Sequence, residues 1–291
     1  MRYTQLRAFH YVATRGGFSR AAEALFLTQP AISDQVRKLE ADYDILLFDR
    51  HKRQVSLTEK GAQLLEISNR LFDAEQQALD FLNDARALEA GTLRLVVDSA
   101  YHITPVLRAF QARYPLIKIA LTVGNSHDVT EALRAYNADI GVLGEIAGSK
   151  EFDVIPLGAT PLIAFAAKSS AHSGVAKMGY QALAGCPLVM REHGSKTRQK
   201  LEQAAKQAGV VLPASIEAEG REAVREIVAA GHGIGFVSTA EFGQDERLFA
   251  INLPAPAPMM RESLICMKER RERRLIKAFM ALAESLAPVA Q

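Results

Sequence analysis

Segment 29–38 carries polar side chains at a spacing suited to recognising DNA. On a helix, Ile32, Val36 and Leu39 share the inward face and leave the polar groups facing outward. The outward set is Gln29, Ala31, Ser33, Asp34, Arg37 and Lys38. Amide and guanidinium groups read base edges in the major groove, while hydroxyl and ammonium groups bind phosphates. The segment therefore predicts a helix that presents one face to DNA.

A helix-turn-helix followed by a wing would hold these groups against DNA. Segment 18–25 has apolar residues at helical spacing, with Ser19 as its predicted cap, and Thr28 is predicted to cap the second helix. Pro30 falls in the first turn of that helix, where the missing N–H costs nothing. Segment 46–58 predicts two short strands around a basic tip, which is the pattern of a wing.

Two kinds of DNA contact are expected from these elements. Gln29, Ser33 and Arg37 are expected to lie at or near bases, and the basic tip is expected to bind backbone phosphates. The full predicted DNA surface is Thr28, Gln29, Pro30, Ala31, Ser33, Asp34, Arg37, Lys38, Arg50, Lys52 and Arg53. Short alanine-rich helix pairs also occur in bundles that never touch DNA, and this is the alternative interpretation of 18–40.

Four loops in the remainder of the chain place polar groups where predicted strands end or helices begin. They are 98–102, 124–127, 192–198 and 219–222. Helix N-termini favour anions, although ordinary helix capping is the alternative at each loop. The candidate ligand-binding residues are Ser99, Ala100, Tyr101, His102, Asn125, Ser126, Glu192, Ser195, Lys196, Thr197, Arg198, Arg221 and Glu222. Together they suit a small anion, and a phosphate-like group above all.

Alternating strand and helix patterns after residue 91 indicate an α/β fold. Helices are expected up to Tyr114-Pro115 and at 129–136. Strands are expected at 92–98, 118–123, 140–143, 154–157, 162–166, 188–190, 233–237 and 264–267. This alternation predicts parallel sheets covered on both faces. A division near residue 163 with a return near 266 would give two lobes with a cleft between them.

Segment 58–89 reads as one long helix with a narrow apolar seam. Its seam residues alternate three and four apart: Leu64, Ile67, Leu71, Ala74, Ala78, Phe81, Ala85 and Leu88. A seven-residue repeat of this kind faces a partner helix, so the segment predicts a dimer. The alternative, a surface helix packed on its own domain, is disfavoured by the acidic and amide residues around the rest of the helix. The alanines on the seam predict close approach and modest strength.

Composition narrows the class of protein. With 291 residues, 48% of them hydrophobic, and a net charge of +2, the chain can bury a sizeable second core, and two or three domains are expected. Cys186 and Cys266 have no metal-ligand spacing and are expected to be buried, inert thiols, so no disulfide, zinc or other cofactor is expected. No apolar run approaches about 18 residues. We therefore expect no signal peptide, no membrane span and a cytoplasmic protein.

An enzyme acting on a small anionic metabolite in the cleft, with the N-terminal module as an anchor, is the alternative function. We see no nucleophile elbow, metal-ligand spacing or phosphate-binding glycine loop, so no catalytic residue is expected. The candidate acid–base pairs would be Asp98 with His102 and Glu192 with His193. The glycines at 231–235 are interpreted as a turn, and the charged run 268–274 as the solvated start of the C-terminal helix.

Several of these motifs together resemble the LysR-type transcriptional regulators. The match rests on Leu6, Phe9, Gly17-Phe18-Ser19, Ala21-Ala22, Leu25, Thr28-Gln29-Pro30-Ala31-Ile32-Ser33, Leu39-Glu40, Leu47-Phe48, Arg50, Leu57-Thr58 and Gly61. Asp44 stands where the family usually has a glycine that closes the recognition helix. Aspartate tolerates the left-handed conformation better than most residues, so we expect the fold to survive this departure.

The resemblance implies a three-part α/β architecture. It implies a winged helix-turn-helix at 1–58, a dimerising linker helix at 59–89, and a periplasmic-binding-protein-like effector domain at 90–291. Lobe I of that domain is expected at about 90–163 and 267–291, and lobe II at about 164–266. The implied partners are double-stranded operator DNA, a small anionic effector and further copies of the chain, as a homodimer and as a tetramer built from two dimers.

The loop residues also resemble those of a LysR-type subgroup associated with 2-aminoethylphosphonate catabolism. The resemblance implies that Ser99, Asn125, Ser195 and Thr197 surround a phosphonate, with Glu192 or Glu222 meeting the ammonium end. The expected function is thus transcription regulation controlled by a small anion, with 2-aminoethylphosphonate or a related phosphonate as the expected effector.

Overall fold

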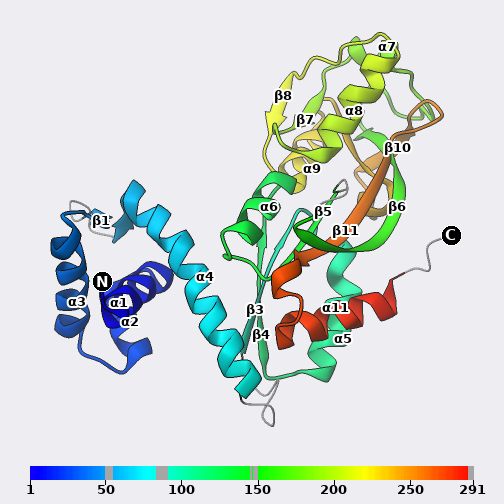
Figure 1. Cartoon of the computed structure of the whole chain (residues 1–291). Coiled ribbons are helices and arrows are strands. Elements are labelled where there is room, and N and C mark those ends of the chain that lie inside the picture. Colours follow the sequence, from blue (N-terminus) through cyan, green and yellow to red (C-terminus); the bar gives the residue numbers. More distant parts are fainter. Residues whose placement is uncertain (50–54, 83–90, 145, 147–149, 288–291) are drawn as a thin grey trace. The chain divides into compact units, whose positions relative to one another are not determined.

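The computed structural model describes residues 1–49, 55–82, 91–144, 146 and 150–287, and the chain divides into two compact units (Figure 1). The first unit is Met1–Ala85 and the second is Arg86–Gln291. Within the described residues, no helix is both long enough and apolar enough to cross a membrane.

The first unit is a winged helix-turn-helix. Its elements are α1 (Tyr3–Arg15), α2 (Phe18–Leu25), α3 (Gln29–Tyr43), the antiparallel strands β1 (Phe48–Asp49) and β2 (Ser56–Leu57), and α4 (Glu59–Leu82). The predicted inward face of α3 is confirmed, because Ile32, Val36 and Leu39 are buried in the core with Phe9. The helix pair and the two wing strands are thus as the sequence predicts.

The cap predicted for α3 is correct, whereas the cap predicted for α2 is not. Thr28 Oγ1 accepts the Ala31 N–H at 3.4 Å, which confirms the cap predicted for α3. Asp44 closes α3 in the left-handed conformation, with φ 51° and ψ 48°, as expected. The cap predicted at Ser19 is wrong, because α2 begins at Phe18 with Gly17 as its N-cap. Glu40 then fixes the entry to the wing by accepting the Leu47 N–H at 2.9 Å.

Helix α4 packs on its own unit through a face that includes only the first residue of the predicted seam, Leu64. Ser68 is buried and its hydroxyl lies 3.0 Å from His10 Nδ1, while Phe72 stacks near the His10 ring. The seam residues Ile67 and Leu71 are 56% and 41% exposed. The last seam positions, Phe81, Ala85 and Leu88, fall where the structure does not describe the side chains. The seam positions Ile67, Leu71, Ala74 and Ala78 are exposed and therefore stay available to another chain.

Lobe I of the second unit is built around parallel strands. β3 (Gly91–Val97) lies between β4 (Ile117–Val123) and β5 (Ile140–Gly144) and is parallel to both. The helices α5 (Thr104–Arg113), α6 (Ser126–Arg134) and α11 (Arg274–Leu286) belong to this lobe, and α5 and α11 pack together through residues such as Phe110 and Phe279. The N-terminus of α6 and the short helix η1 (Tyr101–Ile103) follow the carboxyl ends of β4 and β3.

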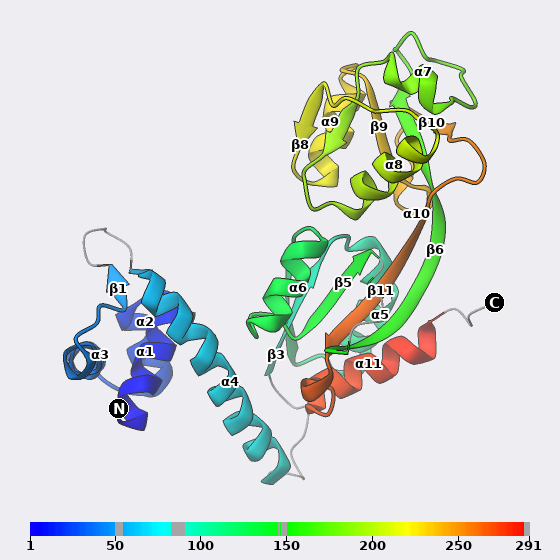
Figure 2. The same cartoon turned by 45° about the horizontal axis from the view of Figure 1, so that its top comes forward.

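Two long antiparallel strands, β6 (Phe152–Ala167) and β11 (Met259–Met267), run between the lobes (Figure 2). The sequence predicts two separate strands where β6 is continuous, and that prediction is wrong. Pro156 and Pro161 weaken regular pairing, but β11 stays paired with the strand past Pro156 and as far as Pro161, with a bulge between Glu262 and Ser263. Beyond Pro161, β6 pairs with the strands of lobe II instead.

Lobe II surrounds the far end of β6. β9 (Ile234–Ser238) and β10 (Leu248–Asn252) pair antiparallel with β6, and β7 (Val189–Arg191) pairs parallel with β8 (Ile216–Ala218). The helices of this lobe are α7 (Tyr180–Ala184), α8 (Lys196–Gln207), α9 (Arg221–Ala229) and α10 (Thr239–Phe242). The sheets are thus mixed, so the expectation of purely parallel sheets is only partly correct. The sequence analysis missed β8 and β10.

Three further expectations have clear outcomes. The glycine turn is confirmed: Gly233 lies between α9 and β9 with φ +128°, and a Cβ there would come within 2.3 Å of the Pro187 carbonyl oxygen. The prediction that the charged run 268–274 is the solvated start of the C-terminal helix is wrong at Arg270. That residue ends the short helix η2 (Lys268–Arg270), and its side chain is fully buried against Asp139. Cys266 is buried as expected, whereas Cys186 is only half-buried.

Candidate functional site

Helix α3 presents the predicted polar groups on its outward side. Gln29, Arg37 and Lys38 are exposed, and Ser33 and Asp34 are partly exposed. Lys38 and Asp34 form an ion pair of 2.7 Å one turn apart, which is a surface pair of small energetic value. The remaining predicted groups on the helix, Thr28, Pro30 and Ala31, lie at its first turn. Arg50, Lys52 and Arg53 lie outside the described residues.

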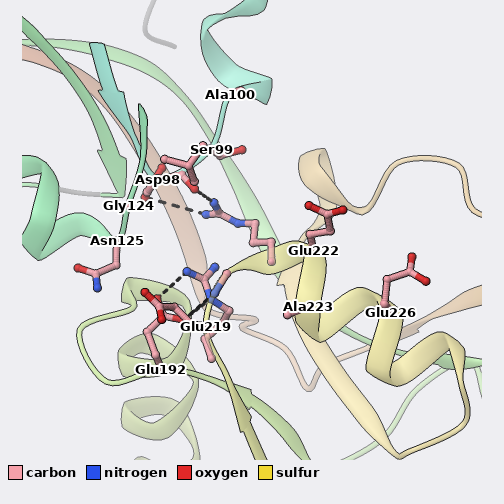
Figure 3. Close-up of a pocket in the computed structure, with 14 residues that line it drawn as sticks. Asp98, Ser99, Ala100, Gly124, Asn125, Glu192, Glu219, Glu222, Ala223 and Glu226 are labelled. Carbon is pink, nitrogen blue, oxygen red and sulfur yellow. Dashed lines mark hydrogen bonds and ion pairs between the residues drawn. The ribbon is translucent and has the colours of Figure 1, made fainter. Parts of the chain in front are cut away.

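A cavity of about 840 Å³ lies between the two lobes of the second unit (Figure 3). Lobe I contributes Asp98, Ser99, Ala100, Val123, Gly124 and Asn125 to its lining. Lobe II contributes Arg191, Glu192, Glu219, Gly220, Arg221, Glu222, Ala223 and Glu226. In the close-up, Asp98 and Asn125 lie on one side of the cavity, and Glu222 and Glu226 lie on the α9 side.

Beside this cavity, a narrow gap brings two helix N-termini together. It is lined by Asp98, Asn125, Ser126, Arg191, Ser195, Lys196, Thr197 and Arg221, and its volume is about 10 Å³. α6 begins after Asn125, whose side-chain oxygen accepts the N–H groups of His127 and Asp128 at 2.9 and 3.1 Å. α8 begins after Ser195, which makes no side-chain cap bond. The two termini belong to different lobes, so a group held here would contact both.

The arginines of the cleft already have carboxylate partners. Arg191 donates two hydrogen bonds of 2.7 Å to Glu192, which outweigh burial and hold the pKa of Glu192 below its usual value. Arg221 begins α9 in lobe II and donates to the Asp98 carbonyl oxygen in lobe I. Its Nε lies 3.2 Å from Glu241 Oε2. Arg221 therefore ties the lobes together, and its charge is shared among acidic groups.

A buried acidic cluster lies next to Arg221. It comprises Asp98, Glu241 and Glu262, with His102 among them; His102 Nε2 is 3.4 Å from Glu241 Oε1 and 3.9 Å from Glu262 Oε1. Burial and the charges of Asp98 and Glu241 raise the pKa of Glu262 to about 8. Burial also raises the pKa of Asp98. For Glu241, His102 and Arg221 outweigh the effect of burial, and the pKa falls to about 2.

Comparison with known proteins gives two family matches that together span nearly the whole chain. Residues 3–62 match the model for the bacterial regulatory helix-turn-helix protein of the lysR family, and residues 86–287 match the LysR substrate binding domain. This chain belongs to the LysR family of transcriptional regulators. The family resemblance seen in the sequence is thereby confirmed, as is the two-part fold of a helix-turn-helix and a two-lobed α/β domain.

Among curated relatives of this LysR-family regulator is the HTH-type transcriptional activator CmpR of Synechocystis, 30% identical over 80% of this chain and 78% of that protein. A RuBisCO operon transcriptional regulator of Allochromatium vinosum is 31% identical over the same shares. A full-length OxyR variant from Pseudomonas aeruginosa has TM-score 0.77, 19% identity and coverage of 100% and 99%. The Synechocystis CcmR regulatory domain in complex with 2-PG has TM-score 0.60, 22% identity and coverage of 68% and 97%.

These comparisons decide between the two functions left open by the sequence. The matched families and relatives are transcriptional regulators, so the expectation of a regulator rather than an enzyme is confirmed. They do not support the narrower phosphonate subgroup, because these two relatives are named as the transcriptional activator CmpR and as a RuBisCO operon regulator.

The regulator's structure brings together most of the predicted ligand residues, but not all. Asn125, Ser126, Ser195, Lys196, Thr197 and Arg221 line the narrow gap, and Ser99, Ala100, Glu192 and Glu222 line the larger cavity. Tyr101 is exposed on η1, and His102 turns toward Glu241 and Glu262. Arg198 does not line either cavity; it donates to the Arg191 carbonyl oxygen at 2.8 Å and forms ion pairs of 2.8 Å with Glu202 and 2.6 Å with Glu217.

Neither candidate acid–base pair has the partner expected from the sequence. His102 faces Glu241 at 3.4 Å, and His193 lies 3.8 Å from Glu217 at the surface. The predicted ligand set also left out several residues of the cleft, two of which, Asp98 and Glu219, lie in the predicted loops. The residues left out are Asp98, Arg191, Glu219, Glu226, Glu241 and Glu262. Arg191 ends strand β7 immediately before a predicted loop, so the rule that ligands collect at strand ends would have found it.

Proposed function

We propose that this regulator binds operator DNA through α3 and the wing, and that a small anion held between the lobes of the second unit controls it. The proposed divisions are a DNA-binding domain at 1–58, a linker helix at 59–89 and an effector domain at 90–291, with lobes divided near 163 and 266. The exposed seam on α4 supports a homodimer, and a tetramer of two dimers is the proposed larger assembly. We place its action in the cytoplasm, where bacterial DNA lies.

On the DNA side, we propose base or near-base contacts by Gln29, Ser33 and Arg37, and phosphate contacts by the basic wing tip. The supporting observation is that α3 buries its apolar face and leaves these three polar groups accessible. Arg37→Ala is then expected to cost about 1–3 kcal/mol on the specific site and to relax its specificity. Arg108→Ala, an exposed charge on α5, serves as the charge-matched control and is expected to change neither.

Footprinting and salt titration on the DNA flanking the gene test these roles. Arg53→Ala is expected to weaken binding to all sequences alike and to lower the salt slope by about one. A change in sequence preference in Arg53→Ala with an unchanged slope would show that base and phosphate roles are assigned the wrong way round.

On the effector side, the observation that carries the proposal is the meeting of two helix N-termini from different lobes. α6, whose first N–H groups are capped by Asn125, and α8, which has no side-chain cap bond, both begin at a gap lined by Arg191, Lys196 and Arg221 together with Asp98. This is a favourable environment for a tetrahedral oxyanion. The gap holds about the volume of one water, so an anion that enters it must change the separation of the lobes. Binding and lobe movement are thereby coupled.

The larger cavity favours a positively charged group on the same effector. Its lining contains the carboxylates of Asp98, Glu192, Glu219, Glu222 and Glu226 against the guanidinium groups of Arg191 and Arg221. This excess of acidic groups favours an ammonium group on the same ligand. A zwitterion such as 2-aminoethylphosphonate carries both kinds of charge, so we propose it as one candidate effector. 2-PG, the ligand in the CcmR complex, is the alternative candidate to compare with it.

Calorimetry on the full chain tests the proposal with 2-aminoethylphosphonate, 2-PG and inorganic phosphate. Thr197→Val keeps the volume of a buried residue at the gap but removes its hydroxyl, and we expect about a tenfold weaker binding of the ligand that binds wild type. Thr122→Val on the exposed side of β4 is the matched control and should bind as wild type does. Failure of all three ligands at millimolar concentration, or equal binding in Thr197→Val, would contradict this assignment.

A further inference from the structure

The cluster of His102, Glu241 and Glu262 holds donor atoms that are buried and unused. The side chains of Glu241 and Glu262 are 3% and 2% exposed, and that of His102 is 10% exposed. His102 Nε2, Glu241 Oε1 and both carboxylate oxygens of Glu262 have no hydrogen-bond partner within the described part of the chain. Buried polar atoms normally find partners, and each one that does not costs stability. Four such atoms in one place point to an occupant.

The arrangement of these atoms is close to that of a metal site. His102 Nε2, Glu241 Oε1 and a Glu262 oxygen all lie within 4.8 Å of one another. His102 Nε2 is 3.4 and 3.9 Å from the two carboxylates, close enough to lower the pKa of Glu241. Tetrahedral donors about 2.0–2.2 Å from a zinc ion would be separated by roughly 3.3–3.6 Å. Small side-chain movements would therefore bring the three donors around one ion.

Neighbouring groups hold the donors in this orientation. Ser238 Oγ donates to Glu241 Oε2 at 2.8 Å, and Arg221 Nε lies 3.2 Å from the same oxygen. Both contacts leave Glu241 Oε1 turned toward His102. Outer contacts of this kind orient the first ligands of known metal sites.

The charge of the cluster also favours a cation. Asp98, Glu241 and Glu262 supply three carboxyl groups, and Asp98 Oδ1 is a further buried oxygen with no partner among the described residues. The groups that oppose the negative charge of this cluster are Arg221, Lys200 and His102 itself. A divalent ion would supply the missing positive charge. Waters would complete its coordination, as they do where a protein offers three ligands.

We propose that His102, Glu241 and Glu262 bind one divalent first-row transition metal ion, with Zn²⁺ and Mn²⁺ as the ions to test. A nitrogen donor with two carboxylate donors suits this class of metal better than Ca²⁺, which prefers six to eight oxygens. The ligands come from η1 of lobe I, from α10 of lobe II and from the connecting strand β11. The ion would therefore cross-link the lobes, independently of any effector in the cleft.

Calorimetry with Zn²⁺ and with Mn²⁺ on the untagged, EDTA-treated full chain tests the proposal, and Co²⁺ absorption reports the ligand field. Wild type is expected to bind one ion per chain. His102→Ala and Glu262→Gln are each expected to weaken binding by about tenfold or more. His193→Ala is the matched control, because His193 lies beside Glu217 at the surface and is 83% exposed. It should bind as wild type does.

Three results would overturn the proposal. They are no stoichiometric binding by wild type, unchanged binding in both His102→Ala and Glu262→Gln, or loss of binding in His193→Ala. Glu262→Gln keeps the shape of the side chain and removes a buried charge, so it should fold; circular dichroism checks this. If His102→Ala does not fold, Glu262→Gln alone decides the matter. Effector binding is measured separately, because its failure would leave the metal result unaffected.

Discussion

Two buried ionic clusters in the second unit differ in how completely their charges are paired. In lobe I, the Asp139 carboxylate accepts hydrogen bonds from Arg94 at 2.8–3.2 Å and from Arg270 at 2.6 Å. Arg270 also donates to the Ala138 carbonyl and lies 4.8 Å from the Tyr136 ring centre. Between the lobes, the acids around His102 retain oxygens with no hydrogen-bond partner in the described residues.

This difference separates the parts that stabilise the fold from the parts that bind. A buried ion pair whose carboxylate oxygens are hydrogen-bonded, as at Asp139, tolerates no loss of one partner, because the other is left buried and charged without a counter-charge. A buried cluster with unused donors reduces stability and keeps those donors ready for a ligand. On this view, Asp139 holds lobe I together, whereas the cluster at His102 and the adjoining cleft are binding machinery.

The largest expected effect is that of Asp139→Asn. This change leaves Arg270 fully buried without its counter-charge, and we expect the free energy of unfolding to fall by about 3–5 kcal/mol. Urea unfolding of the full chain measures it. Glu151→Gln, which breaks an exposed pair with Arg134, is the control and should cost less than about 1 kcal/mol. Equal effects of the two changes would show that the buried pair at Asp139 stabilises the fold no more than an exposed pair does.

The second expected effect concerns stability at low pH. Wild type should lose stability as the pH falls, and Asp139→Asn should lose less. Burial opposes ionisation of Asp139, but the hydrogen bonds and charge of Arg94 and the charge of Arg270 outweigh it and lower the pKa. The contribution of Asp139 is therefore complete above its unfolded pKa of about 4 and is lost as the pH falls through the folded pKa. Unfolding measured at pH 7, 5 and 3 should show a smaller acid loss in the variant than in wild type. Parallel curves would disprove it.

The third expected effect is smaller and has the opposite sign. Glu262→Gln, measured in EDTA at pH 8, removes a charge that faces Asp98 and Glu241. We expect the free energy of unfolding to stay unchanged or to rise by about 1 kcal/mol. A loss comparable to that of Asp139→Asn would mean that the cluster at His102 stabilises the fold after all.

Local patterns in the sequence predicted the helix-turn-helix well. The inward face of α3, its Thr28 cap and its left-handed end at Asp44 depend on residues a few positions apart, where helix geometry is decisive. Most of the cleft was also predictable, because helix starts and strand ends are local features. The prediction failed for β6, because the continuity of that strand is imposed by β11, a segment about a hundred residues later.

The sequence could not reveal the two buried clusters. Arg270 lies in a charged run that is typical of a solvated surface, and only its contact with Asp139, 131 residues away, makes it part of the core. His102, Glu241 and Glu262 come from three separate elements, so no spacing along the chain links them. Short metal-binding motifs are recognised by cysteines and histidines at close, fixed spacing along the chain. The three ligands of this cluster have no such spacing.

On this account, the cleft binds an anion through groups that the fold does not need. Calorimetry and urea unfolding on two cation-to-amide variants test it most directly: Lys196→Gln in the gap and Arg94→Gln at Asp139. We expect Lys196→Gln to weaken binding of the ligand found for wild type by about tenfold, with unfolding changed by less than about 0.5 kcal/mol. Arg94→Gln should lower stability and leave the Kd unchanged. Equal binding in Lys196→Gln and wild type, or an equal loss of affinity in Arg94→Gln, would contradict the account.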